Sequence, residues 1–411
     1  MDFDMLEDLL QNEQTPPTDI KVVGIGGAGG NAINRMIASG LKKVTFVAMN
    51  TDIQALQRSN AQIRMPLGRE LTGGLGAGGV PDVGEKAAQE SREEIKKLLE
   101  GTDMVFITAG MGGGTGTGGA SVVAEVSREV NALTVAVVTT PFAFEGKKKL
   151  QLALSGIEKL RKQVDTLILI PNQYLLKVVE NNTPIKKAFL LADDVLRQGV
   201  QGISELITEP GEINIDFADV KTVMKGKGDA LMGIGVGEGS TRAVDAARAA
   251  INNPLLENAS IDGANSVLVN LAGGDGLTLQ EYQDVVELIT ENCAEDALII
   301  AGQAYNPELG EKIKVTVVAT GFERSEESLE DQIEVIDYKR RKAEGPSLPP
   351  RNGENREQSA ASKRTDLDSE EEVITVNRWQ DLQQQLGNRQ QSNDYSFPAV
   401  LRYQRGEDGD Q

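Results

Sequence analysis

The sequence contains no histidine and a single cysteine, Cys293. Without histidine, imidazole is excluded as a catalytic base and as a metal ligand. A lone cysteine excludes an internal disulfide framework and a multi-cysteine zinc site. Cys293 falls in a stretch with helical spacing, where a packed core thiol is a better interpretation than a nucleophile. The chemistry of this chain must therefore depend on other groups.

The chain is also poor in positive charge. It holds 42 lysine and arginine residues against 62 aspartate and glutamate residues, for a net charge of −20. No strongly basic face is available to neutralise phosphates, so we expect no nucleic-acid partner. No apolar run approaches the ~20 residues of a membrane span. Because the first residues are acidic where a signal peptide is basic, we expect a cytoplasmic protein with no direct membrane insertion.

Short apolar, β-branched runs alternate with helical patterns along most of the chain. The first five runs cover residues 19–26, 43–51, 104–110, 133–140 and 165–171. This alternation predicts an α/β fold with a Rossmann-like, doubly wound parallel sheet. A long helical segment follows at residues 183–208. Further strand-like runs then predict a second, smaller α/β domain, at residues 229–239, 264–274, 297–305 and 312–322.

The predicted organisation has six parts. Glycine becomes rare after Arg324, where the chain turns charged and polar and cannot bury enough apolar surface to offset ordering. The last part is an apolar, aromatic island, which favours a motif that folds onto a partner over a chance cluster. The parts are a flexible N-terminal extension (1–19), a ligand-binding domain (20–182), a central helix with the loop after it (183–227), the second α/β domain (228–322), a disordered linker (323–393) and a C-terminal peptide (394–411).

Glycine is concentrated in three clusters near the ends of expected strands, at residues 24–30, 73–79 and 110–119. A buried strand that passes through glycine into a helix, expected here at residues 119–130, leaves free N–H groups at the helix N-terminus, and this arrangement favours an anion. Six glycines between Gly112 and Gly119 cost too much backbone entropy for a simple turn. The third cluster therefore predicts a phosphate site rather than a tight turn without a ligand.

The first cluster leaves one alternative open. GIGGAGGN matches G-x-G-x-x-G through Gly24, Gly26 and Gly29, and Asp52 lies at the end of the next strand, as in an NAD-linked oxidoreductase. A second, richer glycine loop and the lack of a recognisable hydride-transfer site weigh against that alternative. No G-x-x-x-x-G-K-[ST] motif occurs, which excludes a P-loop. Several glycine loops at one end of a sheet suit a nucleoside triphosphate held mainly by the backbone.

The cluster at residues 112–118 reads GGGTGTG, the tubulin-type phosphate motif. With GIGGAGGNAINRM, NTDIQAL, PFAFEG and NIDFADV in this order, the chain from about Ile20 to Phe322 resembles the tubulin/FtsZ family of GTPases. The resemblance implies GTP or GDP as ligand, with Mg²⁺ whose protein ligands stay unassigned. It implies nucleotide contacts in the glycine-loop region from Gly26, Gly27, Ala28, Gly29, Asn31, Asn50, Gly110, Gly112, Gly113, Gly114, Thr115, Gly116, Thr117 and Gly118.

The resemblance also implies where the sugar and the base lie. Guanine presents N1–H and N2–H₂ donors, which a carboxylate or an amide oxygen accepts. The implied base pocket consists of Asn172, Phe189 and Asp193. From the residues alone, helix packing for Phe189 and surface solvation for Asp193 are the preferred interpretations. Four residues would border the ribose: Thr139, Pro141, Glu145 and Lys149.

The segment NIDFADV supplies the candidate catalytic residues, Asn214, Asp216 and Asp219. From spacing alone, Asp216 is predicted to cap a helix and Asp219 to lie in its first turn. The resemblance implies that this loop enters the nucleotide pocket of the next protomer and polarises the attacking water. Hydrolysis would then depend on head-to-tail assembly. A scaffold that binds GTP without hydrolysing it is the second alternative.

The partners implied by the resemblance are other copies of the chain and a set of division proteins. Head-to-tail contacts that do not close give filaments. In this family the filaments form the bacterial division ring at mid-cell, beneath the inner membrane. The terminal peptide around Phe397–Arg402 is expected to bind membrane-tethering and regulatory division proteins.

Overall fold

The computed structural model of the chain describes residues 18–176, 179, 182–209, 211–253, 263–291, 293–294 and 296–322. The chain divides into two units, Met1–Pro346 and Ser347–Gln411, and every described residue belongs to the first. The predicted linker, the C-terminal peptide with Phe397–Arg402 and most of the N-terminal extension lie outside the described residues.

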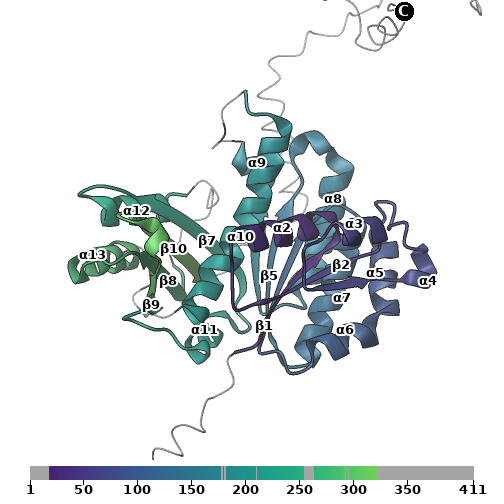
Figure 1. Ribbon diagram of the computed structural model, residues 1–411, viewed down its shortest axis with the longest axis horizontal. Helices are drawn as coiled ribbons and strands as arrows, with labels where there is room; N and C mark the ends of the chain where they lie inside the picture. Colours follow the sequence, from purple (N-terminus) through teal and green to yellow (C-terminus); the bar gives the residue numbers. More distant parts are fainter. Residues whose placement is uncertain are drawn as a thin grey trace, which may run out of the picture. The chain divides into compact units, whose positions relative to one another are not determined.

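The strands of the described residues form one ten-stranded sheet in the order β3-β2-β1-β4-β5-β6-β7-β10-β8-β9 (Figure 1). The five runs predicted for the parallel sheet are β1, β2, β4, β5 and β6, and they pair in parallel. Strand β3, which was not predicted, and β7, which was expected in the second domain, extend the same parallel sheet, whereas β10 is antiparallel to both β7 and β8. The strands are β1 (Ile20–Ile25), β2 (Thr45–Asn50), β3 (Ile63–Pro66), β4 (Met104–Gly110), β5 (Leu133–Thr140), β6 (Thr166–Pro171), β7 (Gly228–Gly237), β8 (Ser266–Gly273), β9 (Leu298–Tyr305) and β10 (Ile313–Thr320).

Helices cover both faces of the sheet. Neighbouring strand residues point to opposite faces, so Val22 joins one hydrophobic core and Val23 the other. The first core is covered by α2 (Gly26–Ala38), α10 (Ile185–Thr208) and α11 (Phe217–Met224). The second core is covered by α5 (Pro81–Glu90), α6 (Arg92–Leu99), α7 (Thr115–Glu129) and α8 (Lys147–Arg161). A third core lies on the strands around β10 and is covered by α12 (Arg242–Ile251) and α13 (Leu279–Thr290). The doubly wound α/β fold predicted from the sequence is confirmed.

Shorter helical segments lie in the connections. These are α3 (Ile53–Gln57), α4 (Arg69–Thr72), α9 (Asn172–Leu175) and the 3₁₀ turns Ala143–Glu145 and Pro307–Leu309. The long central helix expected at residues 183–208 is α10. Within the described ranges, no helix is both long enough and apolar enough to span a bilayer.

Helix α7 begins earlier in the glycine motif than the sequence indicated. It starts at Thr115, so that Gly116, Gly118 and Gly119 lie inside its first turns. A Cβ on Gly118 would lie 2.0 Å from the carbonyl oxygen of Pro81, which begins α5. Glycine here permits close packing of α5 on α7, so part of the motif serves helix packing.

We predict that Gly118→Ala lowers the free energy of unfolding by about 1–3 kcal/mol, because its Cβ collides with rigid backbone. Gly30→Ala is the matched control, since this α2 position has no atom within 4 Å of the added Cβ. Alanine is the better helix former, so the control should gain roughly 0.5–1 kcal/mol. Urea denaturation measures both changes, and equal stabilities for the two variants would contradict this account of Gly118.

An ion pair joins α12 to α13 beside the antiparallel strands. Arg242 Nε donates to Glu281 Oε1 at 2.6 Å, and its Nη2 donates to Glu281 Oε2 at 3.1 Å. The same guanidinium donates to the carbonyls of Gly276 and Glu311. The hydrogen bonds from Arg242, and a further one from the Thr278 N–H, lower the pKa of Glu281 to about 2. Glu281 therefore stabilises the fold in its ionised form.

The pKa of Glu281 predicts a pH-dependent loss of stability. Because the folded pKa of about 2 is below the ordinary value of 4.5, this stabilisation is complete above pH 4.5 and is lost as the pH falls toward 2. We expect Glu281→Gln to cost about 1–2 kcal/mol at pH 7, after allowing for solvent screening, and less at pH 3. Chemical denaturation at the two pH values measures this. Asp284→Asn, on the same helix, is the control, and a Glu281→Gln deficit that is equal at both pH values would refute the linkage.

Candidate functional site

Four strand ends and two helix starts meet at one edge of the parallel sheet. In the strand register, Ile25 pairs with Ala109, Gly110 with Thr139 and Thr140 with Pro171, so β1, β4, β5 and β6 end side by side. Helix α2 starts directly after β1, and α7 starts five residues after β4. Neither helix has a side-chain cap at its N-terminus. Their first N–H groups remain free to bind an anion.

Glycine shapes the surface between these two helices. Gly26 has a φ of +73°, and a Cβ there would lie 2.9 Å from the Gly116 nitrogen. Gly112 has a φ of +101°, and a Cβ there would lie 2.9 Å from the Lys149 oxygen. At Gly27 and Gly113, by contrast, a Cβ would have no atom within 4 Å. Gly26 and Gly112 thus let backbone segments approach each other, whereas Gly27 and Gly113 leave bare backbone facing open space.

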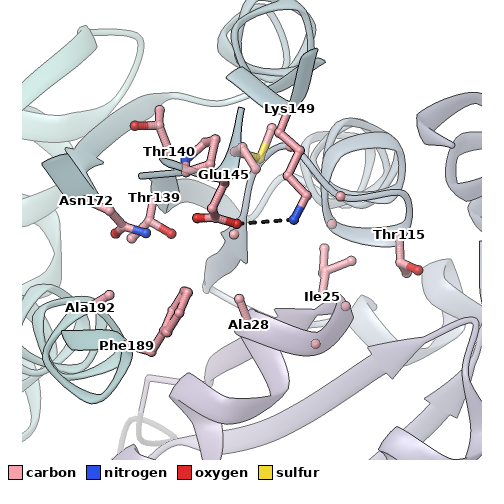
Figure 2. Close-up of a pocket in the computed structure, with 18 of the residues that line it drawn as sticks. Ile25, Ala28, Thr115, Thr139, Thr140, Glu145, Lys149, Asn172, Phe189 and Ala192 are labelled. Carbon is pink, nitrogen blue, oxygen red and sulfur yellow. Dashed lines mark hydrogen bonds and ion pairs between the residues drawn. The ribbon is translucent and has the colours of Figure 1, made fainter. Parts of the chain in front are cut away.

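These elements enclose a pocket of about 280 Å³ (Figure 2). Its lining includes most of the residues named from the sequence, drawn from every predicted part of the nucleotide site. They are Gly26, Gly27, Ala28, Gly110, Gly112, Gly113, Gly114, Thr115, Gly116, Thr139, Pro141, Glu145, Lys149, Asn172, Phe189 and Asp193. The structure thus gathers segments from residue 26 to residue 193 into one cavity.

Five expected contact residues are not part of this lining: Gly29, Asn31, Asn50, Thr117 and Gly118. Thr117 shapes the loop instead, because its Oγ1 accepts a hydrogen bond from the Gly112 N–H at 2.8 Å. Gly29 is packed against β4, where a Cβ would lie 2.4 Å from the Thr108 oxygen. Gly29 and Thr117 therefore support the shape of the site from behind.

Four residues of the lining were not named from the sequence: Ile25, Met111, Thr140 and Ala192. Each is the immediate neighbour of a predicted residue, at a strand end or on α10. In the sequence, only their position next to the motifs could have indicated these residues, because their side chains carry no distinctive chemistry.

One side of the pocket combines an aromatic ring with oxygen acceptors. Asn172, Phe189 and Ala192 lie together on this side in Figure 2. Asn172 is only 6% exposed, and its Oδ1 has no hydrogen-bond partner among the described residues. Phe189 is 40% exposed and its ring meets the ring of Phe142 edge to face, with centroids 5.3 Å apart. A buried acceptor beside an accessible ring suits a planar ligand with hydrogen-bond donors.

Asp193 is held next to this side of the pocket by α2. Its Oδ2 accepts a hydrogen bond from Arg35 Nε at 3.2 Å. Burial raises the pKa of Asp193 even though Arg35 opposes the shift. The carboxylate is therefore partly desolvated, which strengthens any hydrogen bond that it accepts from a ligand.

The opposite side of the pocket carries its cationic group. Lys149 Nζ lies 3.2 Å from Glu145 Oε2, as the dashed line in Figure 2 marks. The Lys149 side chain is 53% exposed, so the ammonium is free to move toward a second anion. Thr115 lies nearby, and its hydroxyl is hydrogen-bonded to the Thr51 hydroxyl at 2.6 Å.

The acidic loop lies far from this pocket in the same chain. Phe189 and Asp193 are near the start of α10, whereas the loop with Asn214 follows its end. Helix α10 has 24 residues, a length of about 36 Å. Asp216 caps α11 by accepting the Asp219 N–H at 2.8 Å, so the helix-capping interpretation is confirmed.

Asp52 and Cys293, which the sequence analysis considered, have structural roles in the described part of the chain. Asp52, which raised the possibility of a dinucleotide site, caps α3 by accepting from the N–H groups of Gln54 and Ala55. Cys293 is partly buried against the third core.

Among the residues that the structure describes, no group of three or more acidic or cysteine side chains is placed to hold a metal ion.

Comparison with known proteins agrees with this geometry. Residues 19–180 match the tubulin/FtsZ family GTPase domain, and residues 228–323 match the FtsZ family C-terminal domain. A solved FtsZ dimer from M. jannaschii, described as empty, is 46% identical, with a TM-score of 0.73; the match covers 78% of this chain and 93% of that chain. A tryptophan-to-tyrosine FtsZ mutant from M. jannaschii is 47% identical, with the same TM-score, over 77% of this chain and 95% of that chain.

A more distant structure shares the fold alone. CetZ2 from Haloferax volcanii is 21% identical, with a TM-score of 0.64, over 80% of this chain and 100% of that chain. Nothing in these matches supports the oxidoreductase alternative. The glycine-lined pocket, the two matched domains and the identity to FtsZ over most of the chain lead to one conclusion: this chain belongs to the tubulin/FtsZ family, a family of GTPases.

Proposed function

We propose that this protein binds GTP in the pocket between α2, α7 and α10 and assembles head to tail into filaments that hydrolyse it. The observation that carries the proposal is the separation of the pocket from the acidic loop by the whole of α10. A copy displaced along the α10 direction brings the loop of one protomer to the pocket of the next. Such a contact is heterologous and does not close, so it propagates as a filament.

The chemistry divides between two protomers. One chain holds the triphosphate against the free N–H groups of α2 and α7, while Lys149 balances its charge. The neighbouring chain supplies Asn214, Asp216 and Asp219, whose oxygens orient the water for attack on the γ-phosphorus. Phosphoryl transfer needs positioning and charge stabilisation more than covalent help, so completing the site by assembly is sufficient to start hydrolysis. Loss of the γ-phosphate then weakens the contact and sets the filament lifetime.

Mg²⁺ belongs to this proposal as the partner of the triphosphate. Both carboxylates that line the pocket are already paired, Glu145 with Lys149 and Asp193 with Arg35. The residues fit an ion held mainly by phosphate oxygens rather than by a protein cage, as is usual for Mg²⁺ bound with nucleotides. When bound, it would neutralise charge that develops on the phosphates.

The cellular part of the proposal follows from the family. We infer that the filaments form the division ring at mid-cell, in the cytoplasm beneath the inner membrane. The peptide around Phe397–Arg402 would attach them to membrane-tethering and regulatory proteins, with the preceding linker setting its reach. The dimeric state named for the M. jannaschii relative is consistent with self-association.

Replacing Asn172 with leucine should weaken nucleotide binding without lowering protein stability. The buried Oδ1 has no partner among the described residues, so leucine removes an unsatisfied acceptor and should leave the unfolding free energy of the nucleotide-free protein unchanged or higher. The same change removes an acceptor for guanine N–H groups, and the Kd for GTP should rise about tenfold. Fluorescence titration with labelled GTP measures the affinity, and wild-type affinity would exclude Asn172 from base recognition.

Asp219→Ala should separate GTP binding from turnover. The expected result is unchanged GTP affinity, because Asp219 lies outside the pocket, and a phosphate-release rate at least about 100-fold lower. Asp284→Ala on α13 is the matched control and should keep wild-type turnover. If Asp219→Ala hydrolyses GTP at the wild-type rate, the loop has no catalytic role and the proposed split site fails. If the wild-type protein binds GTP without any turnover, the scaffold alternative is correct.

A further inference from the structure

The loop that carries the acidic residues is hydrogen-bonded to the edge strand of the sheet, β9, at Gln303. The Gln303 N–H donates to the Ile213 carbonyl at 2.9 Å. In the other direction, the Glu212 N–H donates to Gln303 Oε1 at 2.8 Å. Gln303 therefore binds two successive residues of the loop, with its backbone and with its amide oxygen.

The loop also lies as close to β9 as the backbone allows. A Cβ on Gly211 would be 1.7 Å from the Gln303 carbonyl oxygen, and a Cβ on Gly302 would be 2.6 Å from Ile215 Cδ1. Ile215 itself is buried, only 6% exposed. Glycine on both sides of this contact leaves no space for the loop to shift toward the strand, and the buried isoleucine opposes a shift away from it.

The contacts continue from Gln303 to the acids through hydrogen bonds inside the loop. Asn214 Oδ1 accepts the Gly211 N–H at 2.8 Å and closes the turn that contains the two residues bound to β9. Asp216 Oδ1 then accepts the Asp219 N–H and starts α11. Helix α11 packs on β8 and β9. The side chains assigned to water activation thus point from a loop whose starting position is set at Gln303.

We propose that Gln303 is a positioning residue for GTP hydrolysis: its amide oxygen fixes the loop of one protomer in the orientation needed at the pocket of the next. This inference rests on the proposed function, in which the loop acts on a neighbour's nucleotide. Gln303 is on β9, at the far end of the sheet order from β3, and does not line the pocket of its own chain. Its effect is on turnover within the filament and not on GTP binding.

The test compares Gln303→Met with Gln303→Glu. Methionine keeps the length and shape of glutamine but cannot accept the Glu212 N–H, whereas glutamate keeps an acceptor at the same place. We expect Gln303→Met to lower kcat per polymerised protomer about three- to tenfold, with the KM for GTP and the sedimented fraction unchanged. Gln303→Glu should retain at least half of the wild-type rate. Gln280→Met, which removes an exposed hydrogen bond on α13, is the matched control and should behave as wild type.

A second variant tests the same contact from the loop side. Gly211→Ala places a methyl group against the Gln303 carbonyl and must push the loop off β9, so it should lower kcat at least as much as Gln303→Met while leaving the Kd for GTP unchanged. This variant keeps the inference testable if a change on β9 impairs folding, which thermal unfolding reports.

The wild-type protein is measured in the same series over a range of protein concentrations. A wild-type rate per protomer that is constant down to dilute monomer overturns the proposed function, whatever the variants do. If the wild-type rate rises with sedimented polymer, the proposed function stands and the variants decide the positioning role. The positioning role is then overturned if Gln303→Met keeps the wild-type kcat, or if Gln303→Met and Gln303→Glu lose activity equally. A loss in Gln303→Met that Gln303→Glu reverses supports it.

Discussion

The close packing of α10 across both halves of the sheet is the constraint on which the other features depend. A Cβ on Gly199 would lie 3.0 Å from Val137 on β5, and a Cβ on Gly202 would lie 2.6 Å from Thr316 on β10. Buried polar contacts fix the position of the helix further: Glu205 pairs with Lys314 on β10, whose pKa is lowered by burial. Because such groups tolerate little displacement once buried, α10 is a rigid connection between the pocket at its start and the acidic loop at its end.

The pocket also resolves an apparent contradiction in charge. A chain with a net charge of −20 is a poor candidate for binding a triphosphate by general electrostatic attraction. The site relies instead on short-range groups, namely two uncapped helix N-termini and glycine backbone at Gly27 and Gly113. Backbone donors keep their strength in an acidic protein because they act over hydrogen-bond distance, where distant charges are screened. Lys149 adds one mobile cation at the rim.

Much of the fold and of the site was predictable from local pattern. The strand runs, the central helix and the capping role of Asp216 all follow from periodicity and spacing, and each is present in the structure. The start of α7 was predicted too late, since Gly116 and Gly118 look like loop residues until the neighbouring α5 is known. Likewise, the position of Asp52 in the sequence suits a dinucleotide-binding site, but its partners are the first N–H groups of α3.

The sequence by itself determined the chemical character of this protein. Without histidine or paired cysteines, and with glycine clusters at strand ends, it indicated an anion held by backbone groups in a parallel α/β fold. Only the tertiary structure decided which residues meet. Residues from Gly26 to Asp193 line one cavity because parallel strands end at a common edge, and Gln303 contacts the acidic loop because β9 lies beside it. Contacts between segments that are distant in sequence depend on strand order and helix packing, which no local pattern encodes.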